Sequence, residues 1–542
     1  MSARDHVTES AVLDSAHVGD ITGAFGSIPA HDHGPRRGLS ARAKTLLAII
    51  GPGLIVMVGD NDAGAFSTYT QAGQNYGVRL LWTLVLLVPV LYVNQEMVLR
   101  LGAVTGVGHA RLILERFGRF WGSFSVIDLF ILNALTIVTE FIGITLAAGY
   151  LGIPKWLAVT LAAVVIVAAA STGSLRRFER VCMALVAGSF LLVPVVLAVH
   201  PPASAVAKGF LVPGMPPHAP LSTVMLLIIA IVGTTVAPWQ LFFQQSYVID
   251  KRITPRFIGY ERVDLWLGIV IVVIGAAAMF GFSDAAFSGT AGAGHFTSAA
   301  GVAAGLAHRA GHVVGDLFAL ALLDASIIGA SAVGLSTAYA AADVAGRNHS
   351  LHRSVATAKG FYATYGLLIV VSATLVVIPG VPLGLLTEGV QTLAGVLLPS
   401  ATVFLLLLCN DRQILGPWVN SSAKNAFAGA VVWILVILSV VLTASVLFPD
   451  ISGRQIEMIL LVGALLGVLL AVVIGRVAAL PAGAAVPSRD DRLNWRMPRS
   501  ALADRPSLTP QVRVGLVVLR GYLLVAFLLV IVKVVEVAAT SR

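Results

Sequence analysis

The sequence predicts an all-α integral membrane protein, and three observations lead to this fold class. Hydrophobic residues make up 57% of the 542 residues, whereas charged residues make up only 12%. The mean hydropathy is +0.89. Apolar runs of about 20 residues, the length at which a helix crosses a bilayer, recur along most of the chain. This composition excludes a soluble multidomain protein, a disordered chain and a disulfide scaffold.

The apolar runs predict about thirteen membrane spans. We expect residues 1–43 to form a disordered cytoplasmic tail, residues 44–450 to form a core of eleven spans, and residues 451–542 to add further membrane helices with a basic cytoplasmic loop. The predicted spans lie near residues 45–71, 79–100, 122–150, 156–171, 178–199, 221–247, 263–283, 314–342, 358–378, 385–409, 426–447, 457–479 and 513–537.

The distribution of Lys and Arg predicts the orientation of these spans. One set of connections carries clusters such as Arg111 to Arg119, Arg176 to Arg180 and Lys251 to Arg256, and the alternate set carries only isolated basic residues. Because positive charge stays on the cytoplasmic side, the basic N-terminal segment is expected there, in a bacterial cytoplasmic membrane. The positive charges are spread over short loops, which indicates contact with anionic lipid and not with nucleic acid.

Two spans contain interruptions of the helical pattern at mid-membrane depth. The first span reads Gly51-Pro-Gly-Leu-Ile-Val-Met-Val-Gly-Asp-Asn-Asp-Ala-Gly-Ala65, and the sixth reads Ile231-Val-Gly-Thr-Thr-Val-Ala-Pro-Trp-Gln240. The interruptions are five spans apart. Because five is an odd number, spans 6–10 would cross the membrane with a topology opposite to that of spans 1–5, which predicts an inverted repeat. Matched interruptions in the first helix of each half indicate a central site, whereas a single one would indicate an ordinary kink.

The first interruption places two acids inside the membrane. Asp60 and Asp62 flank Asn61, and an ionisable group at this depth costs at least about 2.5–3.5 kcal/mol. Since no Lys or Arg lies in the middle of either interrupted span, a divalent cation is the simplest partner, and a network of water, Asn and Thr is the structural alternative. Further oxygen donors in the sixth span are Thr234, Thr235 and Gln240.

The ligand types available in these two spans favour a hard cation. Neither interruption contains Cys or His, and Met57 lies a turn or more upstream of the acids. An oxygen-only site with few protein donors suits Mg²⁺, and Mn²⁺ can bind such a site as well. Glu140 in the third span and Gln391 in the tenth are further candidates, each with a packing role as the alternative. The two cysteines lie in apolar runs, which excludes a zinc or haem site built on cysteine.

The order and spacing of these residues resemble the Nramp divalent-metal transporters over residues 45–450. Gly51-Pro-Gly53 followed by Asp62-Ala-Gly-Ala65 resembles their first-helix Asp-Pro-Gly-Asn motif, and Ala237-Pro-Trp-Gln240 stands where their sixth helix has Met-Pro-His-Asn. Thr139-Glu-Phe-Ile-Gly143 is similar to their third-helix Ala-Glu-Val-Ile-Gly stretch. Leu398-Pro399 with Asn410-Asp-Arg412 resembles the end of their tenth helix, and Gln391 falls where the family has a metal-site glutamine. The resemblance implies the LeuT-like fold of amino-acid and sodium symporters.

The departures from the family pattern resemble the Nramp-related magnesium transporters. Ala65 replaces the Asn ligand, Ala237 replaces the Met that favours transition metals, and Trp239 replaces a His. Ile137 replaces a third-helix acid of the proton route. The resemblance therefore implies Mg²⁺ transport with Mn²⁺ also carried, without proton coupling. The larger acidic pocket left by the lost ligands can hold a partly hydrated ion, which suits Mg²⁺ because it sheds water reluctantly.

We expect a divalent-cation transporter that works by alternating access, with the ion as substrate and no cofactor. The expected site comprises Asp62 as the central ligand, Asp60, Asn61, Thr234 and Gln391 as direct or water-mediated ligands, Glu140 in the second layer, and Ala65 and Ala237 through backbone oxygens. The alternatives are a proton-coupled Mn²⁺ or transition-metal transporter, a sodium- or proton-coupled symporter of a small organic substrate, and a metal sensor without transport. An enzyme is not expected, because no His-Glu-x-x-His or Gly-x-Ser-x-Gly motif is present. The sequence does not predict the oligomeric state.

Overall fold

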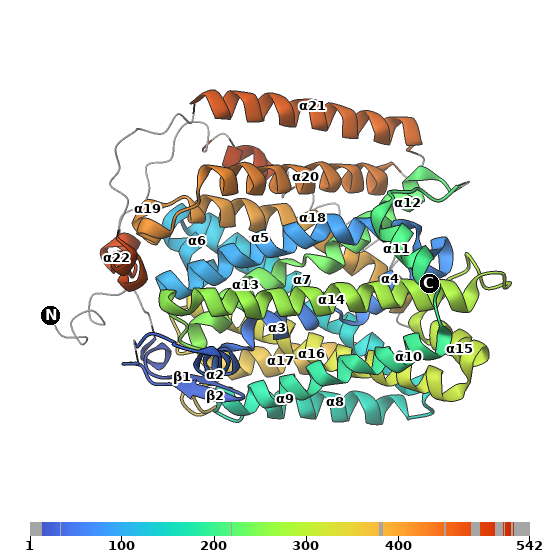
Figure 1. Ribbon diagram of the computed structural model, residues 1–542, viewed down its shortest axis with the longest axis horizontal. Helices are drawn as coiled ribbons and strands as arrows, with labels where there is room; N and C mark the ends of the chain where they lie inside the picture. Colours follow the sequence, from blue (N-terminus) through green and yellow to red (C-terminus); the bar gives the residue numbers. More distant parts are fainter. Residues whose placement is uncertain are drawn as a thin grey trace.

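The computed structural model is built almost entirely of helices, and the long axes of most of them are roughly aligned (Figure 1). It describes residues 14–32, 34–217, 219–378, 383–448, 451–477, 488–503, 513, 515–521 and 524. The elements up to residue 211 are η1 (Ser15–His17), β1 (Ile21–Gly23), β2 (Gly26–Ile28), α2 (Leu39–Ile49), α3 (Pro52–Val58), α4 (Ala63–Tyr76), η2 (Gly77–Leu80), α5 (Trp82–Thr105), α6 (His109–Phe117), α7 (Arg119–Tyr150), α8 (Lys155–Ala170), α9 (Leu175–Gly188), η3 (Ser189–Leu191), α10 (Leu192–Val199) and α11 (Ala203–Leu211).

The second part of the chain continues the same pattern of long helices. Its elements are α12 (Leu221–Thr235), α13 (Pro238–Asp250), η4 (Pro255–Phe257), α14 (Ile258–Phe287), α15 (Ala299–Ala310), α16 (His312–Val344), α17 (Lys359–Val377), α18 (Leu383–Cys409), α19 (Arg412–Leu415), η5 (Gly416–Trp418), α20 (Ser422–Leu447), α21 (Gly453–Val477), α22 (Arg489–Asn494) and α23 (Ser500–Ala503).

The predicted all-α membrane class is confirmed. The described residues, however, contain fewer helices that could cross a membrane than the thirteen predicted. Among the described residues, nine helices are long and apolar enough to cross a membrane, or ten if the bent pair α2 and α3 forms one span. The fourth predicted span is α8, a shorter apolar helix. The thirteenth predicted span, near residues 513–537, falls mostly outside the described residues.

The first predicted span is divided at two points. The chain is already helical from Leu39, six residues before the predicted start, and α2 and α3 meet at an angle of 55°. Gly51 has a φ of +155°, which disfavours other residues, and Pro52 follows at the first position of α3, where its missing N–H is not needed. The helix then ends at Val58 and restarts at Ala63, so residues 59–62 form the predicted interruption.

The sixth predicted span is interrupted more gently. Helix α12 ends at Thr235, and α13 begins at Pro238 after Val236 and Ala237. Together the two parts are long and apolar enough to form one membrane span from Leu221 to Asp250. The chain changes direction less here than between α2 and α3. Both interruptions lie in the core, since α14 packs against α3 and α4 while α16 packs against α7 and α13.

The prediction that residues 1–43 form a disordered tail is wrong for the described part of this segment. Strands β1 and β2 pair antiparallel, with Ile21 opposite Ile28, and both isoleucines are buried. The hairpin lies beside α2 and α9 at one end of the helix bundle (Figure 1). The hairpin is held in place by contacts with the ends of helices that are distant in the sequence. The local sequence of this polar, glycine-containing segment does not reveal these contacts.

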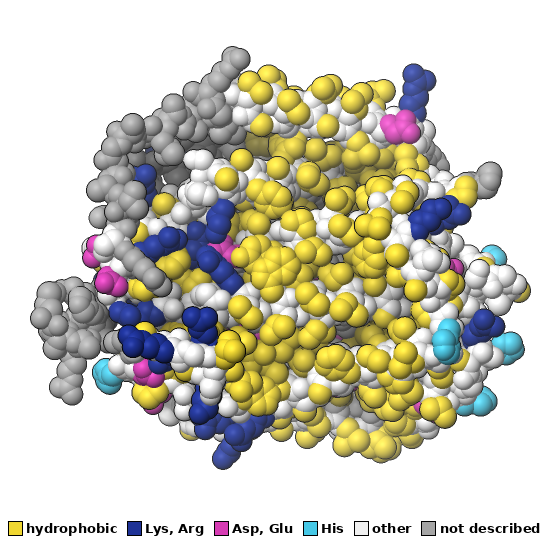
Figure 2. Space-filling model, viewed as in Figure 1, with side chains coloured by type: hydrophobic (Ala, Val, Ile, Leu, Met, Phe, Trp, Pro, Cys, Tyr) yellow, Lys and Arg dark blue, Asp and Glu magenta, His cyan; other side chains and the backbone are white. Residues whose placement is uncertain are grey.

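The charged side chains are distributed unevenly over the surface. Figure 2 shows hydrophobic side chains across the middle of the visible face and Lys and Arg gathered mainly at the end that carries the hairpin. This asymmetry follows the clustering of basic residues in alternate connections of the sequence. It supports the proposal that this end, with the N-terminal segment, faces the cytoplasm.

Candidate metal site

The N-terminus of α4 brings Asp62 and Glu140 together. Asp62 is the N-cap residue of α4, and its Oδ1 accepts a hydrogen bond from the Ala65 N–H at 2.9 Å. Glu140 reaches the same helix end from α7, where its Oε2 accepts the Ala63 N–H at 3.1 Å. The free N–H groups and the positive end of the helix dipole stabilise both carboxylates there. The first turn of α4 therefore fixes the position of Asp62, the predicted central ligand.

Gly329 of α16 leaves the space that these two acids occupy. A Cβ atom at position 329 would lie 2.9 Å from the Glu140 carboxyl carbon and 3.0 Å from Asp62 Cβ. Both distances are shorter than ordinary contacts, so only glycine lets α16 approach the two acids this closely. Gly329 belongs to no motif that pointed to the site in the sequence. The run of small residues around it in α16 was the available signal.

Asp60 lies in the interruption itself and has no assigned hydrogen-bond partner. Neither of its buried carboxylate oxygens makes a hydrogen bond of ordinary geometry within the described residues, and the Gln240 side chain of α13 is a donor that lies close enough to interact with it. Gln240 is held in place by the Gln95 amide, which donates to its Oε1 at 3.0 Å. A buried carboxylate without donors is unstable unless a cation or water completes it.

The second interruption offers uncharged oxygen atoms. The Thr234 hydroxyl is buried and has no partner in the described part of the chain. Pro238 has no N–H, and the Gln240 N–H bonds to the Ala237 carbonyl at 3.2 Å. The carbonyl oxygens of Thr234 and Val236 therefore lose the partners that an unbroken helix would give them. The Tyr69 hydroxyl lies 2.6 Å from the Thr235 Oγ1 and links α4 to α12 across the two interruptions.

Four predicted site residues remain besides the carboxylates and Thr234. The Asn61 side chain turns toward α14, where its Nδ2 donates to the Val272 carbonyl at 3.2 Å. Ala65 and Ala237 are buried, and the Ala65 N–H is used by Asp62. Gln391 belongs to α18, but its side chain lies outside the described residues. The structure thus brings Asp60, Asp62 and Glu140 near one interruption and Thr234 and Ala237 to the other.

No basic side chain neutralises these acids in the described part of the protein. Asp60, Asp62 and Glu140 form no ion pair with Lys or Arg there, and one oxygen of Glu140 also lacks a partner. Within the same residues, no three His, Cys, Asp or Glu side chains are grouped as a ready-made metal centre. The arrangement can therefore bind a cation only with carboxylate, hydroxyl and backbone oxygens together with water.

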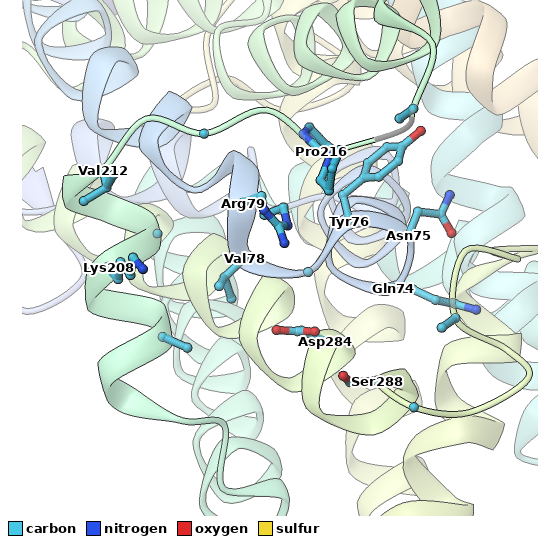
Figure 3. Close-up of a pocket in the computed structure, with 18 residues that line it drawn as sticks. Gln74, Asn75, Tyr76, Val78, Arg79, Lys208, Val212, Pro216, Asp284 and Ser288 are labelled. Atoms are coloured by element: carbon cyan, nitrogen blue, oxygen red, sulfur yellow. The ribbon is translucent and has the colours of Figure 1, made fainter.

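A polar cavity lies away from these acids, at the end of α4 that points away from the hairpin. Its volume is about 740 Å³, and neither Asp60 nor Asp62 lines it. Figure 3 shows Arg79 from η2, Lys208 from α11 and Asp284 from α14 around this hollow. Since Arg79 and Lys208 are exposed, the cavity is a solvated basin near the helix ends and not the buried site.

Comparison with known proteins identifies the family. The matching family model is described as natural resistance-associated macrophage protein-like, or Nramp, and it covers residues 53–445, most of the chain. This chain belongs to the Nramp family. Members of the Nramp family are membrane transporters and not enzymes, as the absence of catalytic motifs predicted.

Named relatives of this Nramp chain include bacterial proteins. The divalent metal cation transporter MntH of Burkholderia ambifaria is 32% identical over 318 residues, which cover 56% of this chain and 69% of the relative. The MntH protein of Lacticaseibacillus casei is 27% identical over 488 residues, covering 82% and 98%. A crystal structure of the Eremococcus coleocola manganese transporter matches with a TM-score of 0.61 and 20% identity over 83% of this chain and 96% of that one. This likeness confirms the predicted LeuT-like fold.

Proposed function

We propose that this protein transports divalent metal cations by alternating access and that it carries Mg²⁺ as well as Mn²⁺. One observation carries the proposal: buried carboxylates that have no basic partner among the described residues lie where two interrupted spans meet. The names of the relatives, divalent metal cation transporter and manganese transporter, support the divalent class of the substrate. Asp62, Asp60 and Thr234 supply side-chain oxygens, and Glu140 orients the first turn of α4.

The absence of sulfur from the second interruption supports transport of Mg²⁺. Ala237 directly precedes α13, as its N-cap residue, at the position where the transition-metal transporters carry Met. A thioether favours soft ions, whereas an oxygen-only site accepts the hard Mg²⁺ ion with part of its water shell. Mn²⁺ accepts the same ligands, so the two ions are expected to compete for one site.

The burial of the site requires a conformational change during transport. Asp60 and Asp62 are at most 4% exposed, so an ion reaches them only after the helices separate on one side. The short helix α3 and the longer α4 are joined by residues 59–62 and can tilt separately. Opening on alternate sides of this joint is the proposed transport cycle.

The membrane potential is sufficient to drive uptake without protons. Moving two positive charges across 100 mV releases about 4.6 kcal/mol, because each charge contributes about 2.3 kcal/mol. This free energy supports roughly a thousandfold accumulation at about 1.4 kcal/mol for each factor of ten. Ile137 and Trp239 stand at positions where the family has titratable groups, which supports transport without proton coupling.

The test is divalent flux into proteoliposomes that hold an inside-negative potassium diffusion potential. We expect Mg²⁺ and Mn²⁺ uptake that a protonophore does not reduce, with Asp62→Ala lowering both by at least about tenfold because it removes the central carboxylate. Asp284→Asn, in the solvated basin, serves as the matched control and should retain normal flux. Normal flux in Asp62→Ala would contradict the assigned site, and no divalent flux in the unaltered protein would contradict the function.

A proton-coupled manganese transporter is the second candidate, and the name manganese transporter of a structural relative favours manganese as the substrate. It differs in two measurable ways from the first proposal. Mn²⁺ flux would exceed Mg²⁺ flux by orders of magnitude, and metal entry would acidify the vesicle interior. Either result would overturn the argument drawn from Ala237 and Ile137.

A further inference from the structure

A second cavity opens beside the first interruption and faces the lipid. Its volume is about 610 Å³, and its walls come from η3, α10, α11, α14 and α16. Most of the lining is apolar, including Phe190, Leu197 and Ile274. These three side chains are 54%, 65% and 62% exposed on the membrane-facing surface of the bundle, so the cavity is accessible from the bilayer.

One carboxylate lies in this apolar cavity. Asp324 of α16 lines it and forms no hydrogen bond or ion pair with any described residue. The carboxylate rests against Gly188, the last residue of α9, where a Cβ atom would lie within 2.6 Å of both carboxylate oxygens. The missing side chain of Gly188 thus gives Asp324 its place at the junction of α9 and η3.

The combination of one acid and apolar walls defines the chemistry of the ligand. An ionisable group among membrane-spanning helices is costly without a partner, and none of the described residues that line this cavity is Lys or Arg. A hydrated metal ion would leave the apolar walls exposed to water, whereas an uncharged lipid chain would leave the acid unpaired. We propose that the cavity binds an amphiphilic organic cation, with its ammonium group on Asp324 and its hydrocarbon body between α10 and α14.

The position of the cavity couples this ligand to the first interruption. Asn61 and Val58 also line the cavity, and the Asn61 amide is the group that ties the interruption to α14. Gly275 of α14 lies against the same amide, since a Cβ atom there would be 2.4 Å from Asn61 Nδ2. A ligand in this cavity, with its body between α10 and α14, therefore lies against the joint between α3 and α4, and it should slow any movement of that joint.

Binding can be tested without any transport measurement. The purified protein in phosphatidylcholine nanodiscs is titrated with decyltrimethylammonium and, in parallel, with the uncharged decanol, while the unfolding temperature is recorded. We expect stabilisation by the ammonium at concentrations at least about tenfold lower than by the alcohol, because only the ammonium pairs with the acid. Asp324→Asn should remove this difference. Asp128→Asn, an intramembrane acid of α7 outside the cavity, should retain it.

A second variant keeps the proposal testable if Asp324→Asn does not fold. Ile274→Trp changes a lipid-exposed residue at the mouth of the cavity, where a larger side chain fits, and it should abolish stabilisation by the ammonium. Equal stabilisation by ammonium and alcohol would overturn the proposal and assign the cavity to a lipid chain. A preference for ammonium that survives both variants would also overturn it, because the cation would then bind elsewhere.

Discussion

Neighbouring threonines at the end of α12 have hydroxyl groups in opposite situations. The Thr234 hydroxyl is buried without a partner, whereas the Thr235 hydroxyl donates to the Ile231 carbonyl and accepts from Tyr69 at 2.6 Å. A buried hydroxyl without a hydrogen-bond partner is unfavourable. The Thr234 hydroxyl is therefore available to an ion, whereas the Thr235 hydroxyl supports the structure.

We predict that Thr234→Val lowers divalent affinity by about fivefold without loss of stability, because it removes an unpaired oxygen. Thr235→Val should instead cost about 1 kcal/mol of stability, since the Tyr69 hydroxyl loses its partner. Thermal unfolding and the KM of Mn²⁺ flux measure the two effects. Equal loss of affinity in both variants would argue against Thr234 as a ligand.

Gly329 gives a second prediction at the scale of one residue. Gly329→Ala places a methyl group against Glu140 and Asp62, and overpacking of this kind costs about 1–3 kcal/mol. We expect a lower unfolding temperature together with loss of flux. Gly366→Ala in α17 is the control, because no atom lies within 4 Å of its added Cβ. That control should be neutral or stabilising, and normal flux in Gly329→Ala would show that the acids have room to move.

At the scale of elements, α14 determines where α3 begins. The Asp264 carboxylate of α14 accepts the Gly51 N–H at 3.1 Å and the Gly53 N–H at 2.7 Å. These are among the N–H groups that the start of a helix leaves unpaired. Pro52 removes one further donor, so a single side chain from a distant helix caps the first half of the interrupted span.

Asp264→Ala should therefore destabilise the protein by about 1–3 kcal/mol for each donor left unpaired. Flux should fall as well, because α3 loses its fixed start beside the site. Thermal unfolding in detergent and proteoliposome flux are the measurements. Asp316→Ala is the control variant, because it also removes one acidic side chain, but from the exposed face of α16. An unchanged unfolding temperature in Asp264→Ala would mean that water replaces the cap.

At the scale of the whole molecule, the N-terminal hairpin joins helix ends that are far apart in sequence. The Ala24 N–H bonds to Glu179 of α9 at 2.7 Å, and the Arg252 guanidinium after α13 bonds to the Ala16 carbonyl. Arg353, which precedes α17, bonds to Asp14 at 2.6 Å. The N-terminal segment that carries the hairpin, residues 14–28, thus bonds to α9 and to the connections after α13 and before α17 at one end of the bundle. It lies beside α2, which leads into the first interrupted span.

Attachment of the hairpin should depend on pH through Asp14. Burial alone would raise the pKa of Asp14, but the hydrogen bonds from Arg353 and from the Ala16 and His349 N–H groups hold that pKa below its usual value. The ionised form therefore stabilises the attachment fully above the ordinary pKa of about 4, and this stabilisation is lost as the pH falls through the lower folded value.

Hydrogen exchange of the hairpin amides between pH 7 and pH 3 measures this effect. We expect protection at neutral pH that decreases toward pH 3. Asp14→Asn should show weak protection already at pH 7 and little further change on acidification. Arg353→Gln should resemble Asp14→Asn, because it removes the same pair from the other side. Strong protection in both variants at pH 7 would show that the remaining contacts are sufficient.

The sequence predicted the parts of the site that depend on local chemistry. Hydropathy and the placement of Gly and Pro located both interruptions, and the lack of basic residues in those spans anticipated acids without ion pairs. The pattern could not show that Asn61 turns to Val272 or that Glu140 caps α4, because side-chain direction depends on which helix lies opposite. The disordered tail was a wrong prediction for the same reason, since its order comes from Glu179, Arg252 and Arg353.

The amino-acid sequence by itself determined the membrane class, the interrupted spans and the oxygen-rich character of the site, because these follow from hydrophobicity, from backbone chemistry and from ligand type. Only the tertiary structure decided which helix caps each interruption, which glycine makes room for the acids and which carboxylate faces an apolar cavity. Those features arise from close packing between segments hundreds of residues apart, and no local pattern encodes that packing.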